Sequence, residues 1–590
     1  MSEHALQLAD AVQLRRLSVS GLRRKSVGGQ IDTGTFSTSD VDVVCDGGGT
    51  GSDYYPELCS QFEELNRLWQ AEDPCDVTLK AGIVEIDAHR KVLSAYSPYF
   101  RAMFASGLSE SLQDEVELQH IDGSALEAVI IFAYTGRLTL NQDNVQQLLE
   151  VSSLLYLDNI TRECCRFLVN ALDPVNSLGI ARFADTYCCP YLLEIAERFT
   201  RLHFSEVAAG EEFLETSAPS LLKLLSSDSL FATDEEEIFK IATAWIVHDP
   251  TERTRHLPAI KETLQLPPDL CRPNSAVIAI NPLEERSRPF HCNGSSRRHY
   301  LRDTLLISGG LTPQGDRLNI METYNAATDR WLQLDVPTLP GQKSGHCSAV
   351  LNGFLYVSGG TDGKLNFSSV HRFDPLAKVW SQGTASMSSS RTYHGMVAVN
   401  GFLYALGGVN NDCDCLSSVE RYDPVRNTWH TAPSMLSKRC GLGVAAVNGV
   451  IYVCGGSDGT FKLNTVERLD LRYQKWEMLS PMVLPRFGLG CCCLNGFLYA
   501  IGGNKQDPAS CERMDLKTHV WEQVPPMSSP RPHGSVHATE RHGRLYVVGG
   551  SDRNENVTLE AFEPDRQTWH PRTALSSPNR IDASVAVLRL

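Results

Sequence analysis

The sequence predicts a multidomain protein that joins an α/β domain, an all-α domain and an all-β propeller of six blades. The propeller is predicted by six Gly-Gly pairs at intervals of 50, 48, 48, 47 and 47 residues, each followed 18 to 21 residues later by one tryptophan. A repeat of this kind is one supersecondary unit that buries its apolar face only against its neighbours. An alternating apolar pattern near residue 77 and apolar residues at intervals of three and four between residues 175 and 248 predict the other two parts.

Each repeat contains the elements of a four-stranded sheet. A short apolar run that ends in two glycines predicts a buried strand and then a sharp turn, because glycine adopts positive φ without strain. A large apolar residue seven positions before each tryptophan marks another strand, and an Asn-Gly or His-Gly dipeptide predicts a tight hairpin. We expect each tryptophan to be a buried anchor of its blade. The tryptophans are Trp331, Trp380, Trp429, Trp476, Trp521 and Trp569.

The two ends of the repeat region indicate how the ring closes. The first repeat begins at its Gly-Gly strand, residues 304–308, and an apolar run at 583–588 remains after the last tryptophan. We expect this run to complete the first blade, which removes an open sheet edge. Because Gly-Gly, a large apolar residue and tryptophan recur in the same order, residues 301–590 resemble the kelch family. The resemblance implies a six-bladed kelch propeller.

Composition restricts the possible partners. The chain has 54 Lys and Arg against 70 Asp and Glu, a formal net charge of -16. This balance argues against a nucleic-acid or membrane surface, because phosphate binding depends on clustered Lys and Arg. The sequence has neither a membrane-length apolar stretch nor a signal-peptide pattern, so we expect no membrane span and a cytoplasmic location. The 18 cysteines lack zinc-site spacing, so we expect free thiols, no metal and no cofactor.

Residues 1–53 are rich in Ser, Gly, Thr and Asp and lack an apolar period, which predicts a disordered N-terminal arm. Two Arg-Arg-x-Ser stretches end at Ser18 and Ser26. This pattern suits a basophilic kinase, and phosphate on either serine would cancel the local positive charge. The alternative, which we favour, is a solvated basic arm.

Residues 54–172 carry the pattern of the α/β domain. Apolar residues at 58, 62, 65 and 69 form one stripe of an amphipathic helix that needs a partner face. Alternating strands are expected at 75–79 and 83–86, followed by helices. The motifs Asp-Val-x-Leu, His-x-x-Val-Leu and Ser-x-Tyr-Phe-x-x-Met-Phe stand in order between residues 76 and 104 and resemble a BTB domain. That family dimerises through the preceding helix, so the resemblance implies a homodimer.

Two groups of residues in this domain are candidates for function. Asp76, His89 and Arg90 could form a charged pocket, but we favour a role in the fold and the dimer. Leu108 and Glu110 stand where cullin-binding BTB proteins carry an apolar residue, any residue and a glutamate. The resemblance implies that Leu108 packs on cullin-3 and that Glu110 helps to hold the loop. The alternative is an ordinary exposed loop.

Residues 173–270 are predicted to be helical, and Pro174 suits a helix start. Segments 176–185 and 236–248 resemble a BACK domain, whose first helices extend the cullin contact in related adaptors, here near 173–200. Prolines at 267, 268, 273, 282 and 289 then stop further helices. The BACK domain therefore looks truncated, through a deletion, an alternative exon or a gene-model error. Residues 271–300 are expected to be a flexible linker.

The predicted substrate site is the propeller face around the central channel. The loop after each Gly-Gly and the loop before each inner strand should meet there, and they differ from blade to blade. Their charged, amide and aromatic groups suit a short peptide. The substrate-binding candidates are Tyr393, Phe487, His533, Lys364, Asn366, Asn410, Asp458, Phe461, Lys505 and Arg553. Arg391, Arg439, Arg486 and Arg531 recur at one position per blade, which predicts framework hydrogen bonding.

Catalysis by this chain is not expected. His346, His394 and His533 recur at one place per blade, which favours a structural role or a rim contact. The chain has no P-loop, no nucleophile elbow and no ligand set like that of copper-containing kelch oxidases. The resemblance implies a kelch-like adaptor that recruits cullin-3 and holds a protein substrate for ubiquitination, with catalysis by proximity. The alternative is a cytoskeletal scaffold that presents two propellers to actin or another filament.

Overall fold

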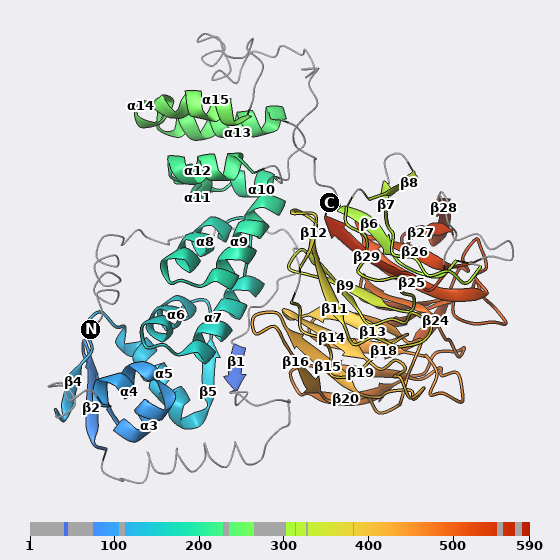
Figure 1. Cartoon of the computed structure of the whole chain (residues 1–590), viewed down its shortest axis with the longest axis horizontal. Helices are drawn as coiled ribbons and strands as arrows, with labels where there is room; N and C mark the ends of the chain where they lie inside the picture. Colours follow the sequence, from blue (N-terminus) through green and yellow to red (C-terminus); the bar gives the residue numbers. More distant parts are fainter. Residues whose placement is uncertain are drawn as a thin grey trace. The chain divides into compact units, whose positions relative to one another are not determined.

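The computed structural model describes residues 41–44, 75–105, 113–227, 230, 235–264, 303–312, 314–325, 329–334, 336–381, 383–551, 558–572 and 581–589. The chain divides into two compact units, one formed mainly by residues up to 300 and the other mainly by residues from 301 onward. Figure 1 shows the first unit in blue to green and the second in yellow to red.

A three-stranded sheet organises the α/β part of the first unit. Strand β2 (Val77–Ala81) pairs antiparallel with β3 (Val84–Ala88) and parallel with β4 (Glu115–Glu117). Alternate residues of β2 are buried, as its alternating sequence predicts. The helices that follow in this part are α3 (Arg90–Tyr96), α4 (Pro98–Ala105), α5 (Gly123–Thr135), α6 (Val145–Leu154) and α7 (Asp158–Asn170).

A short strand extends this part toward the N-terminus. Strand β1 (Val41–Val44) pairs antiparallel with β5 (Arg137–Leu140) (Figure 1). The structure differs here from the predicted disordered arm, because the edge of β5 supplies the backbone partners that the four residues lack by themselves. Candidates Ser18 and Ser26 lie outside the described residues, as do all of residues 1–53 apart from β1.

Eight helical segments follow in residues 177–264, with the break at 228–234 only partly described. The first two contribute Ile180, Ala184, Leu192 and Ala196 to the same apolar core as the sheet. A second core surrounds Trp245, whose indole N–H donates to the carbonyl of Thr216 at 2.9 Å. The segments are α8 (Ser177–Thr186), α9 (Pro190–Leu202), α10 (Phe204–Ala208), α11 (Glu211–Leu214), α12 (Ala218–Leu225), α13 (Glu235–His248), α14 (Pro250–Arg253) with the 3-10 turn η3 (Thr254–His256), and α15 (Leu257–Leu264). The predicted linker 271–300 lies outside the described residues.

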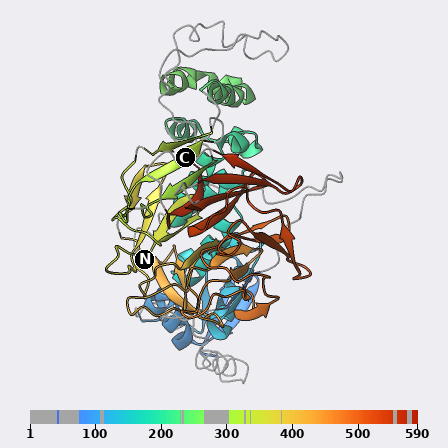
Figure 2. The ribbon, with the colours of Figure 1, turned by 90° about the vertical axis from the view of Figure 1, so that its right-hand side faces the viewer.

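The second unit is the predicted six-bladed propeller. Its described residues form six four-stranded antiparallel sheets, which Figure 2 shows from the side of the later blades. Strand order within a blade follows the sequence, as short hairpins require. Blades 2 to 4 are β9 (Cys347–Leu351), β10 (Phe354–Ser358), β11 (Val370–Asp374), β12 (Val379–Ser381); β13 (Gly395–Val399), β14 (Phe402–Leu406), β15 (Val419–Asp423), β16 (Thr428–Ala432); and β17 (Gly443–Val447), β18 (Val450–Cys454), β19 (Val466–Asp470), β20 (Lys475–Leu479). Blades 5 and 6 are β21 (Gly490–Leu494), β22 (Phe497–Ile501), β23 (Cys511–Asp515), β24 (Trp521–Val524); and β25 (His533–Arg541), β26 (Arg544–Ser551), β27 (Leu559–Glu563), β28 (Thr568–Arg572).

Blade 1 is made from both ends of the repeat region, as predicted. The C-terminal strand β29 (Ser584–Arg589) pairs with β6 (Asp303–Ser308), and β7 (Met321–Asn325) and β8 (Arg330–Gln333) follow outward. Strand β29 also contacts the inner strands of both neighbouring blades, β25 and β9. The ring of inner strands is therefore closed without a covalent link.

The repeated tryptophans act differently from the expected buried anchors. Trp331 and Trp476 are buried, but the other four are only partly buried on the outer strands. In blades 2 to 6 each indole N–H donates, at 2.7–3.0 Å, to a carbonyl in the segment that leaves the preceding blade. Each also lies opposite the predicted large apolar residue of the neighbouring strand, as Phe373 lies opposite Trp380. The tryptophans thus fasten successive blades.

Candidate functional site

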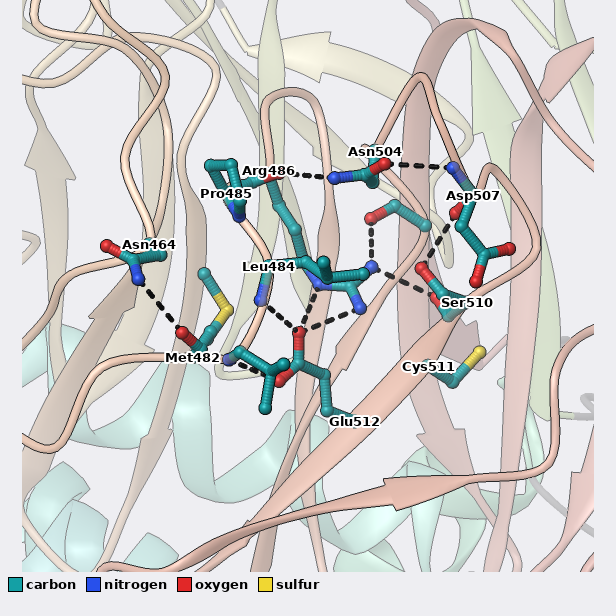
Figure 3. A network of polar contacts seen from close by, with 12 residues as sticks. Asn464, Met482, Leu484, Pro485, Arg486, Asn504, Asp507, Ser510, Cys511 and Glu512 are labelled. Carbon is teal, nitrogen blue, oxygen red and sulfur yellow. Dashed lines mark hydrogen bonds and ion pairs between the residues drawn. The ribbon is translucent and has the colours of Figure 1, made fainter.

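The framework arginines are buried in ion pairs inside their own blades, as predicted. In blade 5, Arg486 donates through Nε to Glu512 Oε1 at 2.9 Å and through Nη1 to the carbonyls of Gly502 and Ser510 (Figure 3). Glu512 also accepts from the backbone N–H of Val483. Neither charged side chain is exposed, and the carboxylate and carbonyl acceptors offset the desolvation of the guanidinium. The corresponding pairs are Arg391 with Glu420, Arg439 with Glu467 and Arg531 with Glu560.

Blade 2 departs from this pattern. Lys343 stands at the arginine position and His371 at the glutamate position, while Pro340 stands where the other blades offer a backbone N–H to the glutamate. Lys343 is only 2% exposed, and burial lowers its pKa to about 8. Burial, with a contribution from Lys343, lowers the pKa of His371 to about 4. His371 is therefore uncharged at neutral pH, and Lys343 is about half protonated at pH 8. The two positions of blade 2 form no ion pair.

Two of the recurring histidines are structural. His346 Nε2 lies 3.1 Å from Ser308 Oγ and His394 Nε2 lies 2.8 Å from Ser358 Oγ, so each imidazole contacts the preceding blade. Both rings are buried, and burial lowers the pKa of His394 to about 3. Neutral histidine is the form that suits such a site. The side chain of His533 lies outside the described residues, although its backbone begins β25.

The segments before the inner strands form a hydrogen-bonded ring, here called the neck ring. In each of blades 2 to 6 one backbone N–H of this segment donates to a backbone carbonyl of the preceding blade at 2.7–3.0 Å. The participating residues are Asp582, Gly345, Tyr393, Gly441, Gly488 and Val536. Between blades 6 and 1 the Asp582 carboxylate closes the ring by accepting from the N–H and hydroxyl of Ser535 at 3.0 and 2.9 Å.

Tyr393 belongs to this ring, although the sequence assigns it to substrate capture. Its hydroxyl donates to Asp582 Oδ2 at 2.9 Å, and its ring lies against Gly345, where an added Cβ would come within 3.3 Å of it. Burial and the nearby Asp582 carboxylate raise the pKa of Tyr393. Tyr393 is only partly exposed. Tyr393 therefore has a structural role in the neck ring, beside which its predicted role in substrate binding stays a prediction.

Phe487 lies beside the same ring. An added Cβ on Gly441 would meet the Phe487 ring at 2.4 Å, so the phenyl group covers this glycine of the neighbouring blade. The backbone N–H of Phe487 donates to the carbonyl of Gly503 at 2.9 Å. The ring is partly exposed, so Phe487 both packs between blades 4 and 5 and presents apolar surface.

The loops after the Gly-Gly pairs meet the segments before the inner strands, as predicted. Backbone bridges join residues 311 and 581, 344 and 361, 392 and 409, and 440 and 457. We call these loops and segments the loop face. The loops are residues 311–317, 361–366, 409–415, 457–462 and 504–510, and the segments are residues 343–346, 391–394, 439–442, 486–489 and 581–583. Most of the candidate residues lie on this face.

Two loops of this face present an apolar tip on an Asx turn. Asp458 Oδ1 accepts from the N–H groups of Thr460 and Phe461, both at 2.7 Å, and these bonds lower the pKa of Asp458. Phe461 is 69% exposed at the tip. Asp362 makes the same turn in blade 2, where it holds the exposed Lys364 and Leu365. Candidate Asp458 thus shapes its loop, and Phe461 and Lys364 are the groups that face outward.

Two amide candidates are used within the loop face. Asn366 Nδ2 donates to the carbonyl of Asn410 at 2.7 Å, and the backbone N–H of Asn366 donates to Asn411 Oδ1 at 2.7 Å. Asn410 Oδ1 accepts from the N–H of Asp412 at 3.0 Å. These bonds join the loops of blades 2 and 3 and leave the two amides less able to grip a peptide than the sequence suggests.

Lys505 is an exposed candidate on the loop of blade 5. Asn504 shapes this loop by accepting from the N–H of Asp507, and its amide donates to the carbonyl of Pro485 (Figure 3). Burial, with a contribution from Lys505, lowers the pKa of Lys462 in the adjacent blade. The two lysines thus give this part of the loop face positive charge. Candidate Arg553 lies outside the described residues.

Sequence reasoning missed three residues of the loop face. Asp582 closes the neck ring, and its place after Arg580 repeats the place of Tyr393 after Arg391, which was the available signal. Arg317 packs its guanidinium over Gly363. Leu365 is 58% exposed at the position that Phe461 holds two blades later.

In the first unit, Asp76, His89 and Arg90 serve the fold. Asp76 Oδ1 accepts from the backbone N–H of Arg90 at 2.7 Å, and Arg90 Nη2 donates to the carbonyl of Gln113 at 2.6 Å. His89 Nδ1 lies 2.9 Å from the hydroxyl of Tyr134, which is buried. These contacts join the start of α3 to the start of β2 and to α5. They support the predicted role of the three residues in the fold, and the role in the dimer stays a prediction.

Residues of α6, α7 and α8, which are neighbours in Figure 1, line an apolar groove. Val145, Phe167, Ile180 and Phe183 line it, and Glu212 stands at one side. Glu212 Oε2 accepts from the N–H of Gly179 at 2.9 Å, and burial raises the pKa of this carboxyl group. The enclosed volume is about 20 Å³, room for one water molecule. The groove is therefore too small for a cofactor, and it offers a partner mainly the partly exposed rings of Phe167 and Phe183.

Several predicted features of the first unit fall outside the described residues. They are the helical stripe at 58, 62, 65 and 69 and the cullin candidates Leu108 and Glu110. Among the helices that the structure does describe, none has the length and apolar character to cross a bilayer. The same residues contain no group of three His, Cys, Asp or Glu placed to hold a metal ion. All their cysteines are free thiols.

Comparison with known families gives three domains in order. Residues 65–172 match the BTB/POZ domain, and residues 177–269 match BACK (BTB And C-terminal Kelch). Residues 281–438 match the KLHDC2/KLHL20/DRC7 Kelch-repeats domain, and residues 438–483 and 485–528 match the Kelch motif. The chain is 32% identical over 349 residues to Kelch-like protein 28 of Mus musculus, which covers 56% of this chain and 61% of that protein. The chain thus spans less than two thirds of the length of this curated relative.

Proposed function

Because the chain belongs to the kelch-like family with BTB, BACK and kelch domains, we propose that it is a substrate-recognition adaptor of a cullin-3 ubiquitin ligase. The BTB and BACK domains bind cullin-3, and the propeller binds the protein to be ubiquitinated. The adaptor contributes proximity, because tethering raises the effective concentration of the ubiquitin-loaded enzyme near the substrate.

The groove between α6, α7 and α8 is the observation that carries the proposal. It lies where the BTB and BACK domains meet. Its lining includes Gly179, Ile180 and Phe183 from the region near residues 173–200, where the resemblance to cullin adaptors implies an extended contact. Phe167 and Phe183 are partly exposed there beside the buried Val145 and Ile180. The exposed parts of these two rings give apolar surface on which a side chain of an extended peptide segment can pack, since such anchors carry much of the affinity of an interface.

The loop face supports the substrate role of the propeller. The neck ring and the buried Arg–Glu pairs hold the loops on a closed scaffold, so the loops lose little conformational entropy when a partner binds. Phe461 and Leu365 are exposed apolar tips, and Lys364 and Lys505 are exposed cations beside them. This combination of apolar anchors with a charged rim is typical of protein recognition.

A matched pair of variants tests the cullin contact. Ala171 is partly buried in the groove at the C-terminal end of α7, and Asn170 is the exposed residue beside it. Glu at either position adds the same charge at the same helix end, so the helix-dipole cost is similar. Ala171→Glu places a carboxylate in the groove near Glu212 and should weaken cullin-3 binding at least about tenfold, whereas Asn170→Glu should not.

Binding of purified cullin-3 to the full chain would be measured by calorimetry, with circular dichroism as a check on folding. Leu108→Asp, which the resemblance places in the same contact, should weaken binding as well. Equal affinity of wild type and Ala171→Glu would contradict a role of the groove. Absence of cullin-3 binding by the wild type, together with co-sedimentation on actin filaments, would replace the adaptor by the scaffold.

A further inference from the structure

Two cysteines meet across the junction of blades 3 and 4. Cys415 lies in the loop that follows Gly407-Gly408 of blade 3, and Cys440 lies directly before the inner strand of blade 4. Their sulfur atoms are 3.3 Å apart, and both residues are buried. A disulfide bond needs about 2.0 Å, so the sulfurs would approach by about 1.3 Å.

The backbone holds both residues in place. Cys440 exchanges two hydrogen bonds with Ser457, at 2.9 and 2.8 Å, and Cys415 forms a bridge with Val409. Cys415 Sγ lies beneath Gly459, where an added Cβ would be 3.5 Å away. Gly459 is exposed and has no side chain, so only a thin layer separates this sulfur from solvent.

At three other blade junctions the corresponding loop positions hold other residues. The bridge patterns put Arg317 opposite Ser344, Asn366 opposite Thr392 and Lys462 opposite Phe487 at the corresponding positions. None of these pairs can form a covalent link. At each of these junctions the repeat places the loop after Gly-Gly of one blade near the segment before the inner strand of the next. Among these junctions, only that of blades 3 and 4 has a cysteine at both positions.

We propose that Cys415 and Cys440 are a redox modification site that forms a reversible disulfide bond between blades 3 and 4. Hydrogen peroxide is the oxidant, and a small-molecule thiol is the reductant that restores the pair. The bond would fix the loop 409–415 to the segment that leads into blade 4, on the loop face.

The chemistry takes two steps. The Cys415 sulfur gives up its proton and attacks a peroxide oxygen; an S–O bond forms, the O–O bond breaks, and the released hydroxide and the proton leave as water. The Cys440 sulfur then attacks the Cys415 sulfenic acid; the S–S bond forms, the S–O bond breaks, and hydroxide leaves with the Cys440 proton as a second water. Two electrons pass from the two sulfurs to the peroxide.

The order of attack follows from the environment of Cys440. Burial and the hydrogen bond from Cys415 raise the pKa of Cys440 to about 12, which keeps it a thiol. Because the thiolate is the attacking form, Cys440 is unsuited to react first with peroxide. The 3.3 Å contact places the Cys440 sulfur to attack a sulfenic acid on Cys415, and Cys440 loses its proton in that step as the S–S bond forms.

The test is peptide mapping of the full chain after reduction, exposure to hydrogen peroxide and blocking of free thiols. We expect one linked pair of peptides that contains Cys415 and Cys440, and its loss after dithiothreitol. Backbone amide exchange of residues 409–416 should slow in the oxidised protein and recover on reduction. Failure to find this link in folded, oxidised wild-type protein overturns the proposal.

Three serine variants assign the roles. Cys440→Ser should leave Cys415 as a sulfenic acid that dimedone labels, whereas Cys415→Ser should leave Cys440 unlabelled. Cys413→Ser is the matched control, because Cys413 is exposed two residues away on the same loop. This variant should keep the link. A link between Cys413 and Cys440, or loss of the link in Cys413→Ser, contradicts the assignment.

Discussion

The hydroxyl of Tyr393 donates to Asp582 Oδ2 at 2.9 Å, across Gly345 of the blade between them. The two residues are 189 positions apart in the chain. The bond joins blade 3 to blade 1, and the same Asp582 joins blade 1 to blade 6 through Ser535. One carboxylate therefore fastens the place where the two ends of the propeller meet.

Removal of the Tyr393 hydroxyl should destabilise the propeller. Tyr393→Phe deletes a hydrogen bond to a charged group and should lower the free energy of unfolding by about 1.5–3 kcal/mol. Tyr473→Phe is the control, because Tyr473 is 74% exposed on an outer turn. Urea denaturation of the full chain measures both. Equal stability of the two variants would mean that the Tyr393 hydroxyl contributes nothing to closure.

The tryptophans should differ in their contribution according to burial. Trp476 is 5% exposed, whereas Trp521 is partly exposed, and both indoles donate to a carbonyl of the preceding segment. Trp476→Ala should cost about 3–5 kcal/mol and Trp521→Ala clearly less, since less apolar surface returns to water. The comparison of their urea midpoints checks this order, and a larger loss for Trp521→Ala would reverse it.

Blade 2 offers a test of the buried ion pair. Lys343→Arg alone places a permanent charge in a buried site without a carboxylate and should be destabilising. Addition of His371→Glu should recover stability, with a coupling energy of about 1–3 kcal/mol in a double-mutant cycle. Arg439→Lys in blade 4 makes the opposite replacement, from arginine to lysine, with Glu467 in place. Its free energy of unfolding shows how much stability this replacement removes. If the stability changes of the two single variants add up to that of the double variant, the two positions do not interact.

Acid should weaken the propeller through its buried histidines. The pKa of His394 is lowered to about 3 by burial, against about 6.5 in an unfolded chain. Between these values the unfolded state binds more protons than the folded state, so stability falls as pH falls, by about 1.4 kcal/mol per pH unit for this residue. His394→Gln should reduce the slope of stability against pH between 6.5 and 4.5. His570→Gln, at a side chain 45% exposed, should change it less.

The sequence by itself determined the architecture. Gly-Gly strands, Asn-Gly hairpins and one tryptophan per unit are local signals, because strand burial and turn geometry act over a few residues. The recurring arginines and the spare strand at the C-terminus were also visible, since repetition exposes a shared structural task. Strand β29 and the buried pair of Arg486 with Glu512 confirm both inferences.

Only the tertiary structure decided what individual loop side chains do. Tyr393 and Asn366 looked like free recognition groups, but one closes the neck ring and the other joins two loops. The contact of Cys415 with Cys440 likewise depends on how two blades are turned against each other. A local pattern records burial and backbone shape, whereas the meeting of side chains from distant segments is fixed by the packing of the closed ring.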